Sequence, residues 1–419
     1  MSRLRTPVPS TTTPSGPTAR AALPSPAARA VPAPAPAARM ALPITPRSSA
    51  DAPAPRAESL YRSDVQFSTL GEIRRAGLAA LDPDVADFLE SGSGAELTLR
   101  ANRAAFARRT IVPRPMHATA SPDTSTSFLG IPLAAPILTA PFGGDALFHR
   151  DGHLAVARAN AAHGIASIVP EAGSFSLEAI AEAAPAAARI LQLHPIDPVE
   201  HVVGMSRRAR RAGYGALCVT VDCPVGGWRT RNRENRFDPD LRHFAGNLDE
   251  TGTIGVAELF GRLLDVDGAR WDWARLREVA AEFELPWIAK GVLGADAAEQ
   301  AIAAGASAIV VSNHGGRQLD HAPASLDVLP EVAEAVAGRV PIALDSGVRT
   351  GADVLLALAL GADVVVLGRL TAYGLAAGGQ HGVARTLELL TDELRTTMAL
   401  AGVERLADLD ARFVGGRPA

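Results

Sequence analysis

The sequence is poor in cysteine, in tyrosine and in long apolar runs. Its 419 residues include only two cysteines and three tyrosines, and aromatic residues make up 5%. Cys218 and Cys223 do not form a CxxC arrangement, so the sequence indicates neither a disulfide framework nor a zinc or other metal site, and a reducing, cytoplasmic setting fits best. No apolar run reaches the roughly 18 residues of a transmembrane helix, so no membrane span is expected.

The sequence also lacks an excess of positive charge. A formal net charge of −4 offers no electrostatic basis for binding nucleic acid or an anionic membrane. Hydrophobic residues, mostly aliphatic, make up 47% and are sufficient for a large core. We therefore expect a globular protein whose partner is a small molecule.

Residues 1–64 differ in composition from the rest of the chain. Thirteen of the 31 prolines precede Arg56, and they are interleaved with alanine, serine and threonine. Such a segment cannot bury a core, so we expect a disordered tail. Scattered arginines and few acids also fit an organelle transit peptide, but the proline density opposes the amphipathic helix that such peptides use.

Residues 65–419 alternate between short apolar runs and alanine-rich helical stretches. A helical prelude that includes residues 70–81 comes first. Eight strand-like runs follow, at 135–140, 165–169, 188–193, 216–221, 285–289, 308–311, 342–344 and 364–367. Eight successive βα units predict an α/β fold, a closed (β/α)8 TIM barrel. Residues 229–272, after the fourth strand, exceed a plain crossover and are predicted to be a lid insertion over the barrel mouth.

Polar residues follow almost every predicted strand, at the edge where barrel active sites are built. The central segment is Ser312-Asn313-His314-Gly315-Gly316-Arg317-Gln318-Leu319-Asp320. An arginine can clamp a carboxylate through two hydrogen bonds, and a histidine can accept a proton near neutral pH. In isolation, an HxxR pattern is as easily a loop histidine and a solvated arginine. Its place after a buried strand favours a site for a substrate with a carboxylate.

Cationic residues also follow the fifth, seventh and eighth predicted strands. Gly347 with Arg349 and Gly368 with Arg369 lie where barrels often bind phosphate. The alternative is that both arginines form ordinary surface ion pairs. Lys290 ends a buried strand, where a cation requires an anionic partner. It is a candidate to stabilise negative charge on a cofactor ring, a structural ion pair and a Schiff-base lysine being the alternatives.

Together these motifs resemble the FMN-dependent α-hydroxy acid oxidase and dehydrogenase family, which includes glycolate oxidase, lactate oxidase and the flavin domain of flavocytochrome b2. The matching pieces are SNHGGRQLD from 312, AKG from 289, TVDCPVGGWR from 220, ENRF from 234, DSGVRTGADVLLALALGA from 345 and LGR from 367. The resemblance covers about residues 70–405. It implies an enzyme that uses FMN to oxidise the α carbon of a 2-hydroxy acid to the 2-oxo product and passes the electrons to oxygen or another acceptor. It also implies a homo-oligomer, a tetramer in many relatives.

The resemblance assigns a function to individual residues. His314 is then the active-site base, Asp222 holds it, and Lys290 stabilises the reduced flavin. The implied substrate contacts are Arg229, Arg317, His194 and Phe88. The implied flavin contacts are Pro141, Phe142, Gly143, Gln192, Thr220, Lys290, Ser312, Asp345, Ser346, Gly347, Arg349, Gly368 and Arg369.

The chain departs from the family where two active-site tyrosines are expected. Phe88 and His194 stand in their places, and the serine expected after the second strand is Pro170, followed by Glu171. The tyrosines of this chain are Tyr61, Tyr214 and Tyr373, and none is expected near the pocket. These changes indicate a substrate unlike glycolate or lactate. An amino-acid-like substrate, an isomerase-type flavoenzyme and a non-catalytic flavin protein are the alternatives.

Replacing His314 with alanine tests the assignment of the base. The variant should bind FMN but lose substrate reduction of the flavin, because general bases contribute about 100-fold or more to rates. Stopped-flow absorbance under anaerobic conditions measures the reduction rate. An unchanged rate would rule out His314 as the base.

Overall fold

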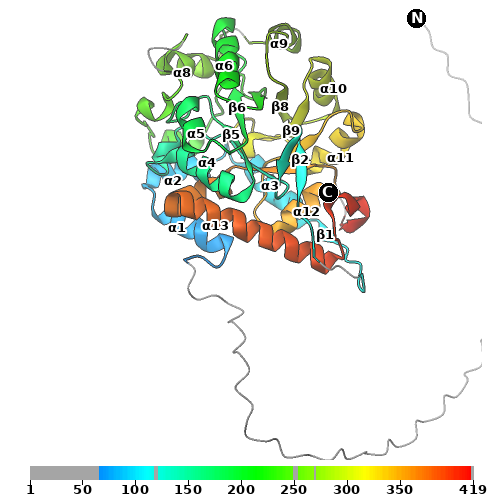
Figure 1. The fold of residues 1–419 in the computed structure, drawn as a ribbon. Helices are drawn as coiled ribbons and strands as arrows, with labels where there is room; N and C mark the ends of the chain where they lie inside the picture. Colours follow the sequence, from blue (N-terminus) through cyan, green and yellow to red (C-terminus); the bar gives the residue numbers. More distant parts are fainter. Residues whose placement is uncertain (1–65, 118–120, 249–252, 269, 417–419) are drawn as a thin grey trace, which may run out of the picture. The chain divides into compact units, whose positions relative to one another are not determined.

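Eight parallel strands close into a barrel at the centre of the computed structural model (Figure 1). They are β4 (Ile137–Thr139), β5 (Ala166–Val169), β6 (Arg189–Leu193), β7 (Ala216–Thr220), β8 (Trp287–Val292), β9 (Ala308–Val311), β10 (Ile342–Leu344) and β11 (Val364–Leu367). Neighbours in sequence pair throughout, and β11 closes the barrel on β4. The predicted TIM barrel is confirmed, with each strand within three residues of its predicted bounds.

The structure describes residues 66–117, 121–248, 253–268 and 270–416, all within the unit Ser59–Ala419. The tail expected over residues 1–64 lies outside the described residues. Within the described ranges, no helix combines the length and the apolar character that crossing a membrane requires.

Helices surround the barrel, as the alternating pattern predicts. They are α4 (Gly152–His163), α5 (Leu177–Ala183), α6 (Val199–Arg211), α9 (Trp273–Ala280), α10 (Ala295–Ala303), α11 (Ser325–Val336), α12 (Gly351–Ala359) and α13 (Arg369–Ala401). The helical prelude consists of α1 (Leu70–Ala79), α2 (Pro83–Glu90) and α3 (Leu97–Ala107). Helix α1 lies against the long α13, so the first and the last α-helix of the described chain pack together on one side of the barrel (Figure 1).

The barrel has two apolar layers because both faces of its strands are covered. Leu138, Ile190 and Val310 belong to the interior cluster. A hairpin of β2 (Thr126–Phe128) and β3 (Ile131–Leu133) adds Phe128 and Leu133 to the same cluster. The outer faces of the strands pack against the surrounding helices. A filled interior leaves only the end of the barrel for a site. Two further short strands, β1 (Thr110–Ile111) and β12 (Val414–Gly415), pair with each other.

The end of the fifth barrel strand differs from its prediction. Strand β8 continues to Val292, so Lys290 lies inside the strand rather than after it. The pairing of β8 with β9 shifts register between Lys290 and Val292. Gly291 lies at this irregularity with φ of 111°, and a β-carbon there would be 2.5 Å from Asp222. Only glycine fits, and the irregularity brings the backbone of β8 against Asp222.

The segment between β7 and β8 includes residues 229–272, whose role as a lid insertion stays a prediction. It forms α7 (Thr230–Glu234), a 3-10 turn at Leu241–Phe244, and α8 (Val256–Leu264) before α9. Phe244, Leu259 and Leu263 form a separate apolar cluster with Ala172, which follows β5. The insertion is therefore anchored to the loops at the carboxyl end of the barrel.

A close contact between two glycines bends α13. Gly378 and Gly379 leave the helical conformation, and a β-carbon on Gly382 would overlap the carbonyl oxygen of Gly374. Gly382→Ala should lower the free energy of unfolding by about 1–3 kcal/mol, because the overlap forces the two halves apart. Gly261→Ala is the control, since Gly261 is exposed in α8 with no atom near the added carbon. It should be neutral or slightly stabilising. Equal thermal midpoints for the two variants would contradict the close contact.

Candidate active site

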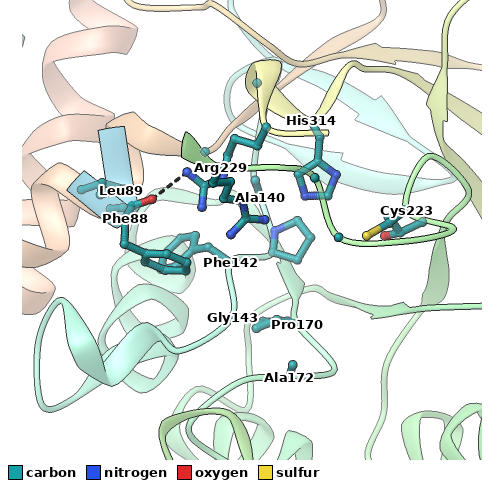
Figure 2. Close-up of a pocket in the computed structure, with 18 of the residues that line it drawn as sticks. Phe88, Leu89, Ala140, Phe142, Gly143, Pro170, Ala172, Cys223, Arg229 and His314 are labelled. Carbon is teal, nitrogen blue, oxygen red and sulfur yellow. Dashed lines mark hydrogen bonds between the residues drawn. The ribbon is translucent and has the colours of Figure 1, made fainter. Parts of the chain in front are cut away.

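A cavity of about 640 Å³ opens at the carboxyl ends of the barrel strands. Nearly all residues assigned to the site from the sequence line it; the exceptions are Asp222 and Ser312, which contact cavity residues from behind. Figure 2 shows Phe88, Phe142, Arg229 and His314 around one space. Residues from α2, from most barrel strand ends and from the insertion therefore meet in one place.

His314 and Asp222 form a pair across the loops that follow β9 and β7. His314 Nδ1 lies 3.3 Å from Asp222 Oδ1. Burial lowers the pKa of His314 below its ordinary value, the Lys290 ammonium lowers it further, and Asp222 acts in the opposite direction. The imidazole is therefore neutral near pH 7. Because Asp222 engages Nδ1, Nε2 is the nitrogen available to accept a proton from a bound molecule.

Lys290 carries a buried positive charge next to this pair. Its Nζ lies 3.3 Å from Asp345 Oδ2 and 3.2 Å from Ser312 Oγ. Burial alone would lower the pKa of Lys290, but Asp345 and Asp222 raise it above its ordinary value. Lys290 is thus an ammonium, which disfavours the Schiff-base alternative. Lys290 does form an ion pair with Asp345, as the structural alternative requires. It also lines the cavity, so it can act on a bound molecule as well.

Arg229 and Arg317 bring two guanidinium groups to the same cavity. Burial lowers the pKa of Arg317 well below its ordinary value, and the charges of Arg229 and Arg369 lower it further. Nη1 of Arg317 donates to the carbonyl oxygens of Phe88 and Ser91, at 2.7 and 2.9 Å. Nε of Arg229 is buried without a hydrogen-bond partner. Within the described part of the chain neither guanidinium forms an ion pair, so an anion in the cavity would relieve both.

Arg349 and Arg369 form a second cationic group, at the ends of β10 and β11. Burial lowers the pKa of Arg369 to about 10, and Arg349 contributes to the shift. Arg369 donates to carbonyl oxygens of Leu89 and Gly315, both at 3.0 Å. In the described ranges neither arginine pairs with a carboxylate. The alternative that both form ordinary surface ion pairs is therefore not supported. Gly368 lines the cavity beside them.

Tyr373 corrects one expectation from the sequence. It was predicted to lie away from the pocket, but its hydroxyl lies 3.4 Å from Arg349 Nη2. Tyr373 lies in the first turns of α13, shortly after the end of β11, which brings it close to Arg349. Its hydroxyl donates to Glu90, which links α13 to α2.

Two residues at the site hold left-handed backbone conformations that favour glycine. They are His314, with φ of 59°, and Ser346, with φ of 77°. Ser346 Oγ accepts a hydrogen bond of 2.9 Å from Gly315 N and donates one of 2.6 Å to Asp345 Oδ1. Ser346 thus ties the loop that carries His314 to the end of β10.

Aromatic side chains form the wall opposite the base. Phe88 stacks on Phe237 with ring centroids 4.8 Å apart and on Phe148 at 6.2 Å. The guanidinium carbons of Arg317 and Arg229 lie 5.1 and 5.6 Å from the centroid of Phe88. The wall is apolar, and the electron-rich face of the Phe88 ring attracts the two guanidinium cations that lie above it.

Glu171 is a site residue to which the sequence assigned no function. It follows β5, is fully buried, and lies 2.7 Å from Nδ1 of His194, which does line the cavity. The only sequence signal was a carboxylate in an otherwise apolar stretch after a strand. Cys223 and Phe237 also line the cavity and were assigned no function, although both lie in matched motifs.

Comparison with known proteins agrees with this arrangement. The model of a family described as FMN-dependent dehydrogenase matches residues 79–415. The L-lactate oxidase of Nostoc sp. is 41% identical over 338 residues, covering 78% of this chain and 92% of that protein. Human 2-hydroxyacid oxidase 1 is 39% identical over 351 residues, with 81% and 94% covered. A solved mandelate oxidase with (S)-2-phenylpropionate has a TM-score of 0.76 at 37% identity, covering 84% of this chain and 98% of that one.

The chemistry of the cavity fits FMN. A solved mandelate oxidase with a C4a-OH-FMN adduct has a TM-score of 0.75 and is 37% identical, with 83% of this chain and 99% of that chain covered. Arg349 and Arg369 supply cationic donors without a carboxylate partner, as a phosphate requires. Gly368 has only one atom, at 3.9 Å, near its missing β-carbon, so the backbone is accessible to a ligand. Lys290 supplies a buried positive charge further inside.

Arg369→Met tests the phosphate end of the cavity. The FMN dissociation constant should rise about 10- to 100-fold, because a charge-assisted hydrogen bond is lost. Arg339→Met is the matched control, since Arg339 pairs with Glu299 on the surface. Fluorescence titration of the apoprotein with FMN measures both. Unchanged affinity in the first variant would show that the phosphate lies elsewhere.

Proposed function

The chain belongs to the FMN-dependent dehydrogenase family and oxidises the α carbon of a 2-hydroxy acid to the 2-oxo product, and we propose that its substrate carries a bulky apolar side chain. The observation that supports the oxidation is the pair Arg229 and Arg317, which have no carboxylate partner among the described residues and lie beside the His314–Asp222 pair. A carboxylate between the arginines would place its α carbon close to the base.

We propose that Arg229 and Arg317 hold the substrate carboxylate. Both are buried cations whose pKa values burial lowers, so an anion is stabilised more strongly there than in water. The carbonyl oxygens of Phe88 and Ser91 fix the Arg317 guanidinium. Binding therefore orients the substrate rather than only attracting it.

His314 would then move the proton. Its neutral imidazole accepts the proton of the substrate hydroxyl at Nε2, while Asp222 accepts a hydrogen bond from Nδ1 and stabilises the resulting imidazolium. The low pKa of His314 keeps the base unprotonated at neutral pH. As pH falls through that pKa the base becomes protonated, so kcat/KM is expected to fall on the acid side.

Bound FMN supplies the chemistry of accepting two electrons from the α carbon. In our proposal Arg349, Arg369, Gly347 and Gly368 hold its phosphate end. The other proposed flavin contacts are Pro141, Phe142, Gly143, Gln192, Thr220, Ser312, Asp345 and Ser346. Lys290 would place its positive charge beside the ring, where reduction adds negative charge.

The aromatic wall supports the proposed substrate side chain. Phe88 and His194 stand where the family has tyrosines, so the cavity loses a hydroxyl at the Phe88 position. Phe88, Phe237 and Phe148 instead stack into a continuous apolar surface. An aromatic or long aliphatic side chain would bury more apolar area there than the methyl group of lactate.

Four further features of the enzyme are proposed: a lid, an electron acceptor, a cellular setting and an oligomeric state. Residues 229–272 would act as a lid, which is supported by the insertion residues in the cavity wall, among them Phe237, Phe244, Leu263 and Leu264. Oxygen is the proposed electron acceptor, as the name oxidase implies for the relatives. The free cysteines Cys218 and Cys223 support a reducing, cytoplasmic setting. A homo-oligomer is proposed from the resemblance to the family.

The substrate class is tested by mixing the holoenzyme anaerobically with matched 2-hydroxy and 2-amino acids. Aromatic 2-hydroxy acids should bleach the flavin absorbance about tenfold or more faster than glycolate or lactate, because about 1–3 kcal/mol of apolar burial is gained. The 2-amino acids should leave the flavin oxidised. Bleaching by glycolate alone would contradict the proposed side chain, and bleaching by no 2-hydroxy acid would contradict the reaction.

A further inference from the structure

A buried carboxylate with both oxygens engaged lies behind the cavity wall. Glu171 Oε2 accepts hydrogen bonds from His194 Nδ1 at 2.7 Å and from the His194 backbone N–H at 3.0 Å. Glu171 Oε1 accepts one from His201 Nε2, in α6, at 2.7 Å. The carboxylate is fully buried, and His201 is 2% exposed. Three donors thus fix the position of one carboxylate.

His194 is the member of this group that reaches the cavity. Its side chain is 12% exposed and lines the cavity with its neighbours Gln192 and Cys223. The amide nitrogen of Gln192 lies 3.1 Å from Thr220 Oγ1, closer than the 3.5 Å to His194 Nε2. Because Glu171 engages Nδ1, Nε2 is the ring nitrogen that a ligand would share with the Cys223 thiol, another side-chain partner of the ring.

The surroundings decide the charge of His194. Burial alone would lower the pKa of His194, but hydrogen bonds to Cys223 and Glu171 raise it to about 10. The two histidines in turn lower the pKa of Glu171 to about 2, against the effect of burial. Glu171 comes from the loop after β5, Cys223 from the loop after β7, and His201 in α6 acts on His194 through Glu171. Across the neutral range the pair is therefore an imidazolium and a carboxylate.

We propose that Glu171 is a positioning residue that, braced by His201, holds His194 as a cationic hydrogen-bond donor to an oxygen of the substrate. The inference deepens the proposed function and rests on it for the identity of the ligand. A 2-hydroxy acid offers two carboxylate oxygens and one hydroxyl. Arg229, Arg317 and His194 provide three charged donors around the cavity, so the imidazolium takes the place of a neutral tyrosine hydroxyl.

A purely structural reading explains the arrangement less well. An isolated ion pair in a protein interior rarely stabilises the fold more than apolar packing does. The residues on either side of Glu171 are Pro170 and Ala172, which line the cavity with apolar surface. A carboxylate at this apolar position is explained if its role is to keep the neighbouring His194 charged.

The experiment measures oxalate binding to the holoenzyme as a function of pH, through the change in flavin absorbance. Oxalate carries the carboxylate but no α hydrogen, so it reports binding without turnover. Wild-type affinity should be nearly constant between about pH 7 and pH 9, because His314 is neutral and His194 stays protonated over this range. In Glu171→Gln, which keeps the shape and removes the charge, affinity should fall as pH rises and be about tenfold or more weaker at pH 9.

Combining Glu171→Gln with a change of His194 distinguishes an effect through His194 from a general loss of folding. In His194→Tyr, which installs the residue of the family, adding Glu171→Gln should change oxalate affinity less than about twofold. His194→Gln alone should bind oxalate about 10- to 100-fold more weakly than wild type at every pH. If Glu171→Gln does not bind FMN, the His194→Gln variant still tests whether His194 contacts the ligand.

Histidine NMR with isotope-labelled protein gives a readout independent of turnover and of oxalate. The His194 signal, assigned by its loss in His194→Tyr, should show an imidazolium up to about pH 9 in the wild type and should titrate at lower pH in Glu171→Gln. An unchanged titration, or an equal loss of oxalate affinity at all pH values with no His194 titration, would overturn the proposal. Failure of the proposed oxidation would appear instead as no flavin bleaching, with these two results intact.

Discussion

The C-terminal end of α2 holds the cationic side of the site together. Carbonyl oxygens of Phe88, Leu89 and Ser91 accept hydrogen bonds from Arg317 and Arg369. The last carbonyls of a helix have no intrahelical partner and carry partial negative charge. Burying a guanidinium costs several kcal/mol, and each hydrogen bond to a charged group contributes about 1.5–3 kcal/mol. The carbonyls offset part of the cost, and bound anions offset the rest. The helical prelude is thus a component of the active site rather than an accessory to the barrel.

Lys290 and His314 lie beside the same two carboxylates but differ in charge. Asp345 and Asp222 together raise the pKa of Lys290, whereas the Lys290 ammonium helps to lower the pKa of His314. One residue therefore remains charged and the other remains neutral, although both are buried. The difference follows from the balance of effects: at Lys290 the two carboxylates outweigh burial, whereas at His314 burial and the Lys290 ammonium outweigh the same two carboxylates. This division supplies a fixed positive charge and a free base within one site.

Much of this site is readable in the sequence because strand order and strand ends are local properties. Apolar runs located all eight strands, and a residue after a parallel strand must lie at the same edge as its counterparts. The strand end at Lys290 was misplaced because Gly291 continues the strand through an irregular pairing. Glu171 was beyond prediction for another reason: its partners lie 23 and 30 residues away, one directly after β6 and one on α6. Tyr373 was missed because its ring meets α2, which is distant in sequence.

In the proposed site, Phe88 and His194 stand where the resemblance to the family implies tyrosines, and this would change the way in which the cavity binds a ligand. A phenol is a neutral donor whose strength varies little with pH below about 10. Phe88 offers no donor at all, and its ring instead lies near two guanidinium groups. His194 offers a donor whose charge depends on Glu171. The cavity has therefore exchanged hydroxyl groups for charge on one side and for apolar surface on the other. Such a division suits a ligand with a concentrated anionic head and an apolar body, and it suits a small polar acid poorly, because the aromatic wall would remain exposed to water.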